Sequence, residues 1–305
     1  MVAIAGDGNN DGGNGATPAY PASAGEALAR CYEALDSAEI YLGHGTDNAW
    51  DESVQLVLGA LGLPPDSGDE VLAMPLEPER WLELKSMLKR RVDGREPLPY
   101  ILGKAWFAGL EFLCDSRALV PRSPLGELIV GGYAPWWTGG APLTILDLCC
   151  GGGCIGIAAA VYEPRARVVL GDLDAAALDL ARENIARHAV SGRVSVQRSD
   201  LFSQLAPQRF DLILCNPPYV DAADIAAMPP EYRREPLHAL AAGDDGLDLA
   251  LEILIQAPQW LTEGGLLFLE LGNSWAALDA LCESLPLTWL EFAEGGHGVL
   301  CIGQE

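Results

Sequence analysis

From about residue 143 to the end of the chain, short apolar runs alternate with helix-like segments, and this alternation constrains the fold more than any other feature. Five runs have the length and character of buried strands, namely Thr144–Cys149, Val168–Asp172, Val194–Val196, Phe210–Cys215 and Leu266–Glu270. Such alternation specifies a parallel sheet with helices on both faces. Two further strand-like runs, 287–292 and 298–302, are separated by Gly295-Gly296 and predict an antiparallel edge pair. Residues 125–305 are therefore expected to form an α/β domain on a seven-stranded mixed sheet whose last strand is antiparallel.

The chain before this domain has two differently organised parts. Residues 1–23 are rich in Gly, Asn, Ala and Pro, which cannot bury enough apolar surface to offset the entropy of ordering, so they predict a disordered arm. Residues 24–93 carry apolar side chains at helical spacing, interrupted at Gly43-His44-Gly45 and at Leu63-Pro64-Pro65. The spacing predicts a small bundle of three or four helices.

Residues 94–124 join these parts and have a strand-like pattern. The strand-like runs are Tyr100–Leu102, Ala105–Phe107 and, after the turn residue Gly109, Leu110–Leu113, which predict a hairpin linker. Its large apolar side chains more often pack between domains than contact a ligand. A linker that carries Phe107 into a cleft would nevertheless form a substrate wall.

Composition limits the partners and the location of the protein. The formal net charge of −24 and the sequence pI of about 4.3 repel phosphate backbones and attract basic partners, so no direct nucleic-acid partner is expected. Eight cysteines without a Cys-x-x-Cys pair, with only four histidines, indicate core packing in a reducing compartment and no metal site. No apolar segment reaches the roughly 20 residues of a membrane span, and the first residues lack a signal sequence. We therefore expect a cytoplasmic protein without a membrane partner.

A glycine-rich loop follows the first strand of the large domain. The run Gly151–Gly156 matches G-x-G-x-x-G, and Asp172 lies 21 residues after Gly151, so a nicotinamide cofactor is one interpretation. Asp147 at the end of the strand favours another, because a carboxylate there would oppose a pyrophosphate at the next helix N-terminus. S-adenosylmethionine has no phosphate and carries a cationic ammonium and a sulfonium. We therefore expect S-adenosylmethionine as the cofactor and S-adenosylhomocysteine as its product.

Acidic residues at the ends of the next strands extend the predicted cofactor site. Asp172 can accept hydrogen bonds from both ribose hydroxyls. Asp200, followed by Leu201, is placed to accept from the adenine amino group, although an Asp here could equally cap a helix. These residues should share one crevice, because each follows the carboxyl end of a strand. The expected cofactor contacts are Asp147, Cys149, Gly151, Gly153, Asp172, Leu173, Asp200, Leu201 and Asn216.

The fourth strand ends in Asn216-Pro217-Pro218-Tyr219, which indicates the chemistry of the acceptor. An amide, two prolines that cannot continue a ladder and an aromatic ring suit a planar NH2 group. The side-chain oxygen of Asn216 and the backbone carbonyl of Pro217 can each accept one N–H of that group, while Tyr219 stacks on it. We predict that these four residues are catalytic and that Asn216, Pro217 and Tyr219 bind the substrate. The stretch by itself does not distinguish an adenine from a glutamine side chain.

These motifs together resemble a known family. The NPPY stretch and the loop DLCCGGGCIGI are similar to those of methyltransferases that act on exocyclic or side-chain NH2 groups. The helical N-terminal part, the hairpin and the stretch PEYRREP at 230–236 resemble, more narrowly, the protein glutamine-N5 methyltransferases of the HemK/PrmC/PrmB group. Within that group, PRSPLGEL at 121–128 is similar to the PrmB type, which methylates a glutamine of a large-subunit ribosomal protein. Release-factor enzymes have Pro-Glu-Thr-Glu at this place.

The resemblance covers roughly residues 25 to 303 and implies a class I S-adenosylmethionine-dependent methyltransferase fold with a helical N-terminal domain that recognises the substrate. It implies glutamine N5-methylation of a basic ribosomal protein, with Phe107 and Arg122 expected at the substrate. Methylation of a release-factor glutamine, methylation of a nucleic-acid amine and a non-catalytic binding module are the alternatives. The acceptor glutamine and the oligomeric state are left open.

One departure from the family pattern lies in the donor loop. The family usually has Thr-Gly-Ser-Gly where this chain has Cys150-Gly151-Gly152-Gly153. The change removes two hydroxyls that could bond the carboxylate of the cofactor, while the backbone donors remain.

Overall fold

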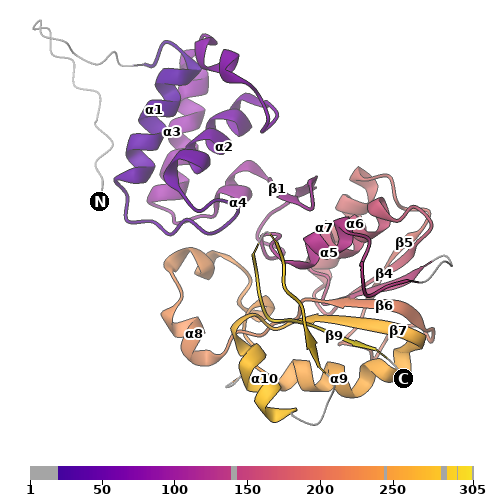
Figure 1. Ribbon diagram of the computed structural model, residues 1–305. Coiled ribbons are helices and arrows are strands. Elements are labelled where there is room, and N and C mark those ends of the chain that lie inside the picture. The colour runs from indigo at the N-terminus through magenta and orange to yellow at the C-terminus, as the bar shows by residue number, and fades with distance from the viewer. Residues whose placement is uncertain (1–19, 139–142, 244–245, 283–286, 294, 304–305) are drawn as a thin grey trace, which may run out of the picture. The chain divides into compact units, whose positions relative to one another are not determined.

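The computed structural model describes residues 20–138, 143–243, 246–282, 287–293 and 295–303. Residues 1–19 of the expected disordered arm lie outside the described residues. The chain forms two compact units, which divide between Gly103 and Lys104 (Figure 1). The predicted hairpin linker is thereby split, with its two strands in the second unit.

The first unit is helical. Its elements are α1 (Ala24–Asp36), α2 (Ala49–Leu61), η1 (Asp69–Ala73), α3 (Pro78–Val92) and α4 (Leu98–Leu102). The side chains of Ser23 and Asn48 cap the first two helices by accepting backbone N–H groups. The predicted strand at Tyr100–Leu102 is wrong, because these residues are in α4. Proline in the first turn supplies a helical φ there, and Gly103 ends the helix at φ 69°.

The second unit begins with the two-stranded hairpin. Strand β1 (Lys104–Phe107) pairs antiparallel with β2 (Leu110–Leu113). The two turn residues, Ala108 at φ 49° and Gly109 at φ 74°, both adopt the left-handed conformation that a tight two-residue hairpin turn requires.

The main sheet has seven strands in the order β5-β4-β3-β6-β7-β9-β8. They are β3 (Thr144–Leu148), β4 (Arg167–Asp172), β5 (Val194–Arg198), β6 (Phe210–Cys215), β7 (Leu261–Glu270), β8 (Thr288–Trp289) and β9 (Val299–Gly303). The first five are parallel, and β9 runs antiparallel to both of its neighbours. The predicted mixed sheet with an antiparallel last strand is confirmed.

Helices cover both faces of this sheet, as Figure 1 shows. One face carries α5 (Leu125–Val130), α6 (Cys154–Tyr162) and α7 (Ala175–Arg187), and the other carries α9 (Asp248–Trp260) and α10 (Trp275–Leu281). The two faces have separate apolar cores, with Ile145, Leu212 and Phe268 in one, and Leu146, Ile213 and Leu267 in the other. This alternation along each strand is the period-two pattern of a sheet buried on both sides.

A segment with little regular structure connects β6 to α9. It contains α8 (Ala222–Ala227), η2 (Pro230–Arg234) and η3 (Leu237–Ala239). The segment returns to its own start, because Val220 and the backbone of Leu240 and Ala242 exchange hydrogen bonds of 2.9 and 3.0 Å. In the part of the chain described above, none of the helices combines the length and apolar character needed to cross a bilayer.

Candidate active site

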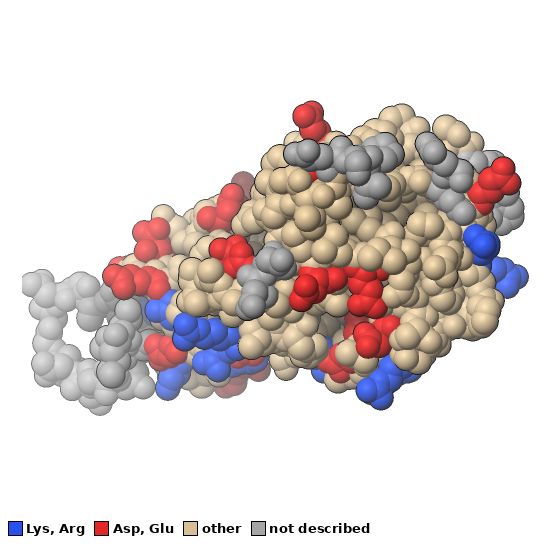
Figure 2. Space-filling model, turned by 90° about the horizontal axis from the view of Figure 1, so that it is seen from below, with Lys and Arg blue, Asp and Glu red and all other residues tan. Residues whose placement is uncertain are grey.

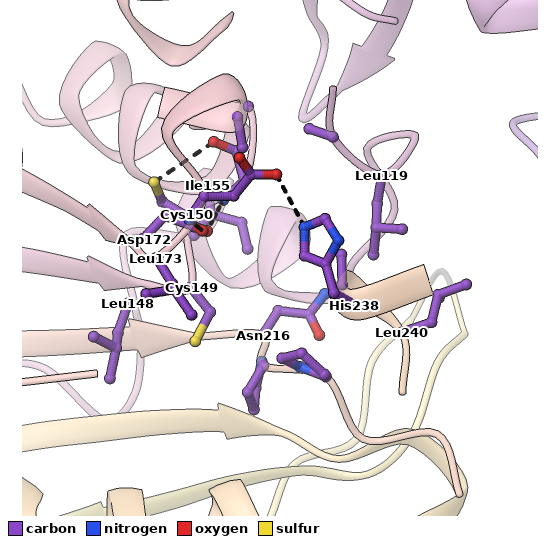
Figure 3. A pocket seen from close by; sticks show the side chains of 18 of the residues that line it. Leu119, Leu148, Cys149, Cys150, Ile155, Asp172, Leu173, Asn216, His238 and Leu240 are labelled. Carbon is purple, nitrogen blue, oxygen red and sulfur yellow. Dashed lines mark hydrogen bonds and ion pairs between the residues drawn. The ribbon is translucent and has the colours of Figure 1, made fainter. Parts of the chain in front are cut away.

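A cavity of about 240 Å³ lies at the carboxyl ends of the parallel strands of the second unit. Open sheets bind their ligands at this edge. Figure 3 shows residues from several strand ends turned toward the cavity. Its walls are formed mainly by residues 117–122, 148–152, 154–155, 171–174, 199–201, 216–220 and 238–240.

The glycine loop after β3 adopts the left-handed backbone conformation at Gly151 and Gly153. Gly151 has φ +52° and lines the cavity. Gly153 has φ +81°, and a Cβ there would lie 2.9 Å from the Leu170 side chain. Gly153 is not among the described residues that line the cavity, and the absence of a side chain there lets the loop pack closely onto β4. Cys149 lines the cavity at φ 59°, a left-handed conformation that is unfavourable for a side chain with a Cβ.

Asp172 at the end of β4 connects the loop to the cavity. Its two oxygens accept from the backbone N–H groups of Gly151 at 2.8 Å and Asp174 at 2.9 Å. A carboxylate has about four acceptor positions, so acceptor capacity remains for the two hydroxyls of a ribose. Burial raises the pKa of Asp172, and the two backbone N–H groups oppose that rise by stabilising the charge.

Asp147 does not occupy the place that the sequence predicts. Its side chain is fully buried beneath the loop and accepts from Gly156 N at 2.7 Å, and it is absent from the described cavity lining. Burial raises the pKa of Asp147 to about 8, which leaves much of it neutral near pH 7. The argument that this carboxylate faces a cationic cofactor is therefore not supported, because the side chain holds the first turn of α6.

Residues at the ends of β4 and β5 reach the predicted adenosine side. Leu173, Asp200 and Leu201 all line the cavity, as expected. The backbone N–H of Asp200 donates to Gln204 at 2.7 Å, so the local turn is held by another side chain. Phe202, which follows them, is buried in the core between the sheet and helices α9 and α10. Its ring stacks on Trp260 with ring centroids 5.5 Å apart.

The stretch Asn216-Pro217-Pro218-Tyr219 lines the cavity along its whole length. Strand β6 is central and fully buried at its carboxyl end, which delivers Asn216 to the crevice. In Figure 3 the Asn216 side chain extends into the cavity near Cys149 and below His238. The structure therefore brings the predicted acceptor residues into one cavity with the predicted cofactor residues other than Asp147 and Gly153.

Two carboxylates behind this wall were not identified from the sequence. Glu270, at the end of β7, accepts from Tyr219 Oη at 3.1 Å and from Ser123 Oγ at 2.6 Å. Glu235 accepts from Arg122 Nη1 at 2.9 Å and from Val120 N at 3.1 Å. These contacts join residues 51 to 147 positions apart. The stretch PEYRREP around Glu235 was noted for its resemblance, but no local pattern indicated the partners of either glutamate.

The two residues expected at the substrate have different positions. Arg122 lines the cavity, with its guanidinium paired to Glu235 and 5.3 Å from the centre of the Tyr232 ring. Phe107 is 6% exposed and packs in the core, with its ring centroid 6.5 Å from that of Phe112. The structure places Phe107 away from the described cavity lining.

His238 on η3 lines the cavity and was not identified from the sequence. Its Nε2 lies 2.9 Å from Asp174 Oδ2, and both residues line the cavity. Figure 3 marks this contact, which joins the segment after β6 to the end of β4.

The donor set fits an adenosine-containing cofactor better than a metal. Asp172 offers free acceptor positions, the positive-φ loop lets backbone approach a ligand, and leucines 148, 173 and 201 supply apolar surface. Within the described residues, no group of three or more His, Cys, Asp or Glu side chains is arranged to hold a metal ion. A substrate NH2 group held beside Asn216 would share this cavity with the cofactor.

Comparison with known proteins identifies close relatives. A family model described as "Methyltransferase small domain" matches residues 141–228. The ribosomal protein uL3 glutamine methyltransferase of Francisella tularensis subsp. tularensis is 47% identical over 269 residues, which cover 88% of this chain and 86% of that protein. The protein of the same name from Bordetella pertussis is 42% identical over 274 residues, which cover 89% and 91%. A solved methyltransferase from Pyrococcus furiosus has 19% identity and a TM-score of 0.47, over 64% of this chain and 89% of that chain.

Proposed function

The chain belongs to the family of ribosomal protein uL3 glutamine methyltransferases, and on this premise we propose that it transfers a methyl group from S-adenosylmethionine to the side-chain amide nitrogen, N5, of a glutamine in a large-subunit ribosomal protein. The observation that carries the proposal is the shared cavity. It is lined at one side by Asp172 at the end of β4 and at the other by Asn216-Pro217-Pro218-Tyr219 at the end of β6.

The residues of this proposal fall into two groups. The cofactor contacts are Cys149, Gly151, Asp172, Leu173, Asp200, Leu201 and Asn216. The substrate contacts are Asn216, Pro217, Tyr219 and Arg122, with Pro218 fixing the turn between them. When bound, S-adenosylmethionine supplies a methyl group on an electron-deficient sulfur.

The protein must make a poor nucleophile reactive, because the lone pair of an amide nitrogen is delocalised into the carbonyl. The Asn216 side-chain oxygen and the Pro217 carbonyl can each accept one N–H of the glutamine NH2. Two fixed acceptors orient the nitrogen, and the Tyr219 ring packs on the planar group. Alignment and exclusion of water supply most of the acceleration, and no strong base is needed if the proton leaves after transfer.

The charge of the chain is compatible with a basic protein substrate. A net charge of −24 attracts Lys- and Arg-rich partners and repels RNA. Figure 2 shows a face on which acidic side chains occur in several separate places, so attraction there is distributed over the surface. From this charge we infer that the enzyme acts on the free ribosomal protein before assembly.

Radioactive methyl transfer tests the proposal. The purified chain is given labelled donor with free uL3, intact large subunits or a release factor, and the methyl group is located by mass spectrometry. We expect labelling of a glutamine in free uL3. Labelling of only the release factor would contradict the substrate assignment, and preferential labelling of intact subunits would contradict the assignment to the free protein.

A further inference from the structure

We propose that Glu270 is a positioning residue for methyl transfer, which orients Tyr219 through its hydroxyl and ties the substrate-side wall to it through Ser123. This inference rests on the proposed function, and it adds a residue that neither the sequence motifs nor the cavity lining identify.

The sheet register places Glu270 beside the acceptor residues. Strands β6 and β7 are parallel neighbours in which Cys215 pairs with Leu269. The next residues along the two strands are Asn216 and Glu270. Asn216 lines the cavity, whereas Glu270 is 5% exposed and is not part of the described lining. Glu270 therefore acts through the residues that it contacts.

The Glu270 carboxylate divides its two oxygens between two partners. Oε1 accepts from Tyr219 Oη at 3.1 Å, and Oε2 accepts from Ser123 Oγ at 2.6 Å. Tyr219 belongs to the acceptor wall, and Ser123 directly follows the 117–122 segment that forms another part of the lining. One buried group thus links two parts of the cavity wall, so its loss changes their spacing.

Other contacts hold the backbone and ring face of Tyr219 but leave the hydroxyl end to Glu270. Ser274 Oγ donates to the Tyr219 carbonyl at 3.0 Å. A Cβ on Gly272 would lie 2.5 Å from the Tyr219 ring, so the ring lies directly against that backbone. With its base and one face fixed, the tilt of the ring depends on where the hydroxyl is held. A ring that packs on a glutamine amide requires that tilt to be constant.

The charge state of Glu270 affects this arrangement. Burial raises the pKa of Glu270 to about 7, while Ser123, Tyr219 and Arg122 oppose the rise. The other groups that interact with it are the Cys154 and Cys215 thiols, whose pKa values its charge helps to raise. The ionised carboxylate accepts both hydroxyls, whereas the protonated acid must use one oxygen as a donor. The arrangement in which both hydroxyls donate to Glu270 therefore belongs to the ionised form, because in the protonated acid one hydroxyl must turn and accept instead.

Activity and stability should respond to this titration in opposite directions. A carboxyl whose folded pKa is raised above its ordinary value costs stability as the pH rises through the folded pKa. Methyl transfer should instead increase over the same range, because the ionised form holds both partners. A residue with only a structural role would not separate the two responses.

The test is a double-mutant cycle of Glu270→Gln and Tyr219→Phe, with Glu263→Gln as the matched control. Glu263 is an exposed residue of the same strand, so the control makes the same chemical change away from the cavity. We expect each single variant to lower kcat about 10- to 100-fold, since misplacement by about 1 Å can cost 10²-fold. The double variant should lose little more than either single variant, while donor affinity and the control variant stay within about threefold of wild type.

The pH profile provides the second measurement. Wild-type kcat should rise through pH 7, and the rise should be absent in Glu270→Gln. A Glu270→Gln variant with wild-type kcat and an unchanged profile would overturn the proposal. So would fully additive losses in the double variant, or a loss confined to donor binding and melting temperature.

A readout without turnover separates this proposal from the proposed function. In protein labelled with 3-fluorotyrosine, the ¹⁹F resonance of Tyr219, assigned by its loss in Tyr219→Phe, should shift with a midpoint near pH 7 in wild type and not in Glu270→Gln. Absence of glutamine labelling by wild type would refute the proposed function alone. A Tyr219 resonance that titrates identically in both proteins would refute the role of Glu270.

Discussion

Replacement of Asp172 by Asn tests whether one carboxylate both holds the donor loop and binds the ribose. Asn is an isosteric replacement for Asp172, because it keeps the shape of the side chain and exchanges one acceptor oxygen for an NH2 group. In the wild type its two oxygens accept from Gly151 N at 2.8 Å and Asp174 N at 2.9 Å. The variant can accept from only one of these groups, and its NH2 faces the other.

These contacts give two separate magnitudes, one for the loss of stability and one for the loss of donor affinity. A partly buried N–H left without a partner costs about 1 kcal/mol, the low end of the range for buried groups, which should appear as a loss of unfolding free energy in the protein without donor. A hydrogen bond to a charged acceptor is worth about 1 kcal/mol more than one to a neutral acceptor. Two ribose hydroxyls on Asp172 would thus contribute about 2 kcal/mol, so the Kd for the donor should rise about 30-fold.

Titration calorimetry with S-adenosylmethionine and with S-adenosylhomocysteine measures the affinity, and denaturant unfolding measures the stability. Asp179→Asn is the matched control, because Asp179 is an exposed residue on α7 paired with Arg182. It should leave both Kd values unchanged. A Kd for Asp172→Asn within twofold of wild type would refute the assignment of the ribose to this carboxylate.

Three further predictions use other contacts of the cavity. Asn216→Ala should lower kcat at least about 100-fold and leave the donor Kd within a few-fold, because it removes an acceptor that orients the substrate nitrogen; calorimetry that shows lost donor binding would contradict this role. Gly272→Ala should lower both kcat and stability, because its Cβ would meet the Tyr219 ring at 2.5 Å at φ +47°, whereas Gly264→Ala, at φ +73° with nothing within 4 Å, should lower stability alone. The unfolding free energy should fall as the pH rises toward 8, because burial raises the pKa of Asp147 to about 8 and ionisation then becomes costly. Asp147→Asn should reduce that slope in denaturant titrations between pH 5 and 8, and an unchanged slope would assign the pH dependence to other groups.

The sheet was predictable because its signal is local. Each buried strand is a continuous apolar run, and the helices between them follow from spacing, so the order of elements could be read from the sequence. The segment Tyr100–Leu102 was mistaken for a strand because three apolar residues do not distinguish a strand from a short helix. There the flanking residues Pro99 and Gly103 were the better evidence.

The cavity lining was partly predictable for the same reason. Asp172, Asp200 and Asn216 lie at or just beyond strand ends, and all three line the cavity. Asp147 also lies near a strand end, but the alternation of side chains along β3 places it on the face of the sheet that α6 covers, away from the cavity. Position at the end of a strand therefore predicts the edge of the sheet, and the face must be determined separately.

Glu270 could not be found from local pattern, because its partners Ser123 and Tyr219 lie 147 and 51 residues away. A buried carboxylate is stable only with such partners, and they are supplied by the register between strands. The contacts of Glu270 thus follow from the order and register of the strands, whereas the sequence near it indicates only the end of an apolar strand.

The strand order explains why donor and acceptor meet where they do. From β3 the chain proceeds to β4 and β5 on one side, and it then returns to place β6 and β7 on the other side of β3. A crevice forms at this reversal. The proposed cofactor residues Cys149, Asp172 and Asp200 lie at or just beyond the ends of β3, β4 and β5, and Asn216 and Glu270 lie at the ends of β6 and β7. Methyl transfer across the β3–β6 boundary would need no large movement of the sheet, because Leu148 and Cys215 are paired there and Cys149 and Asn216 follow them directly.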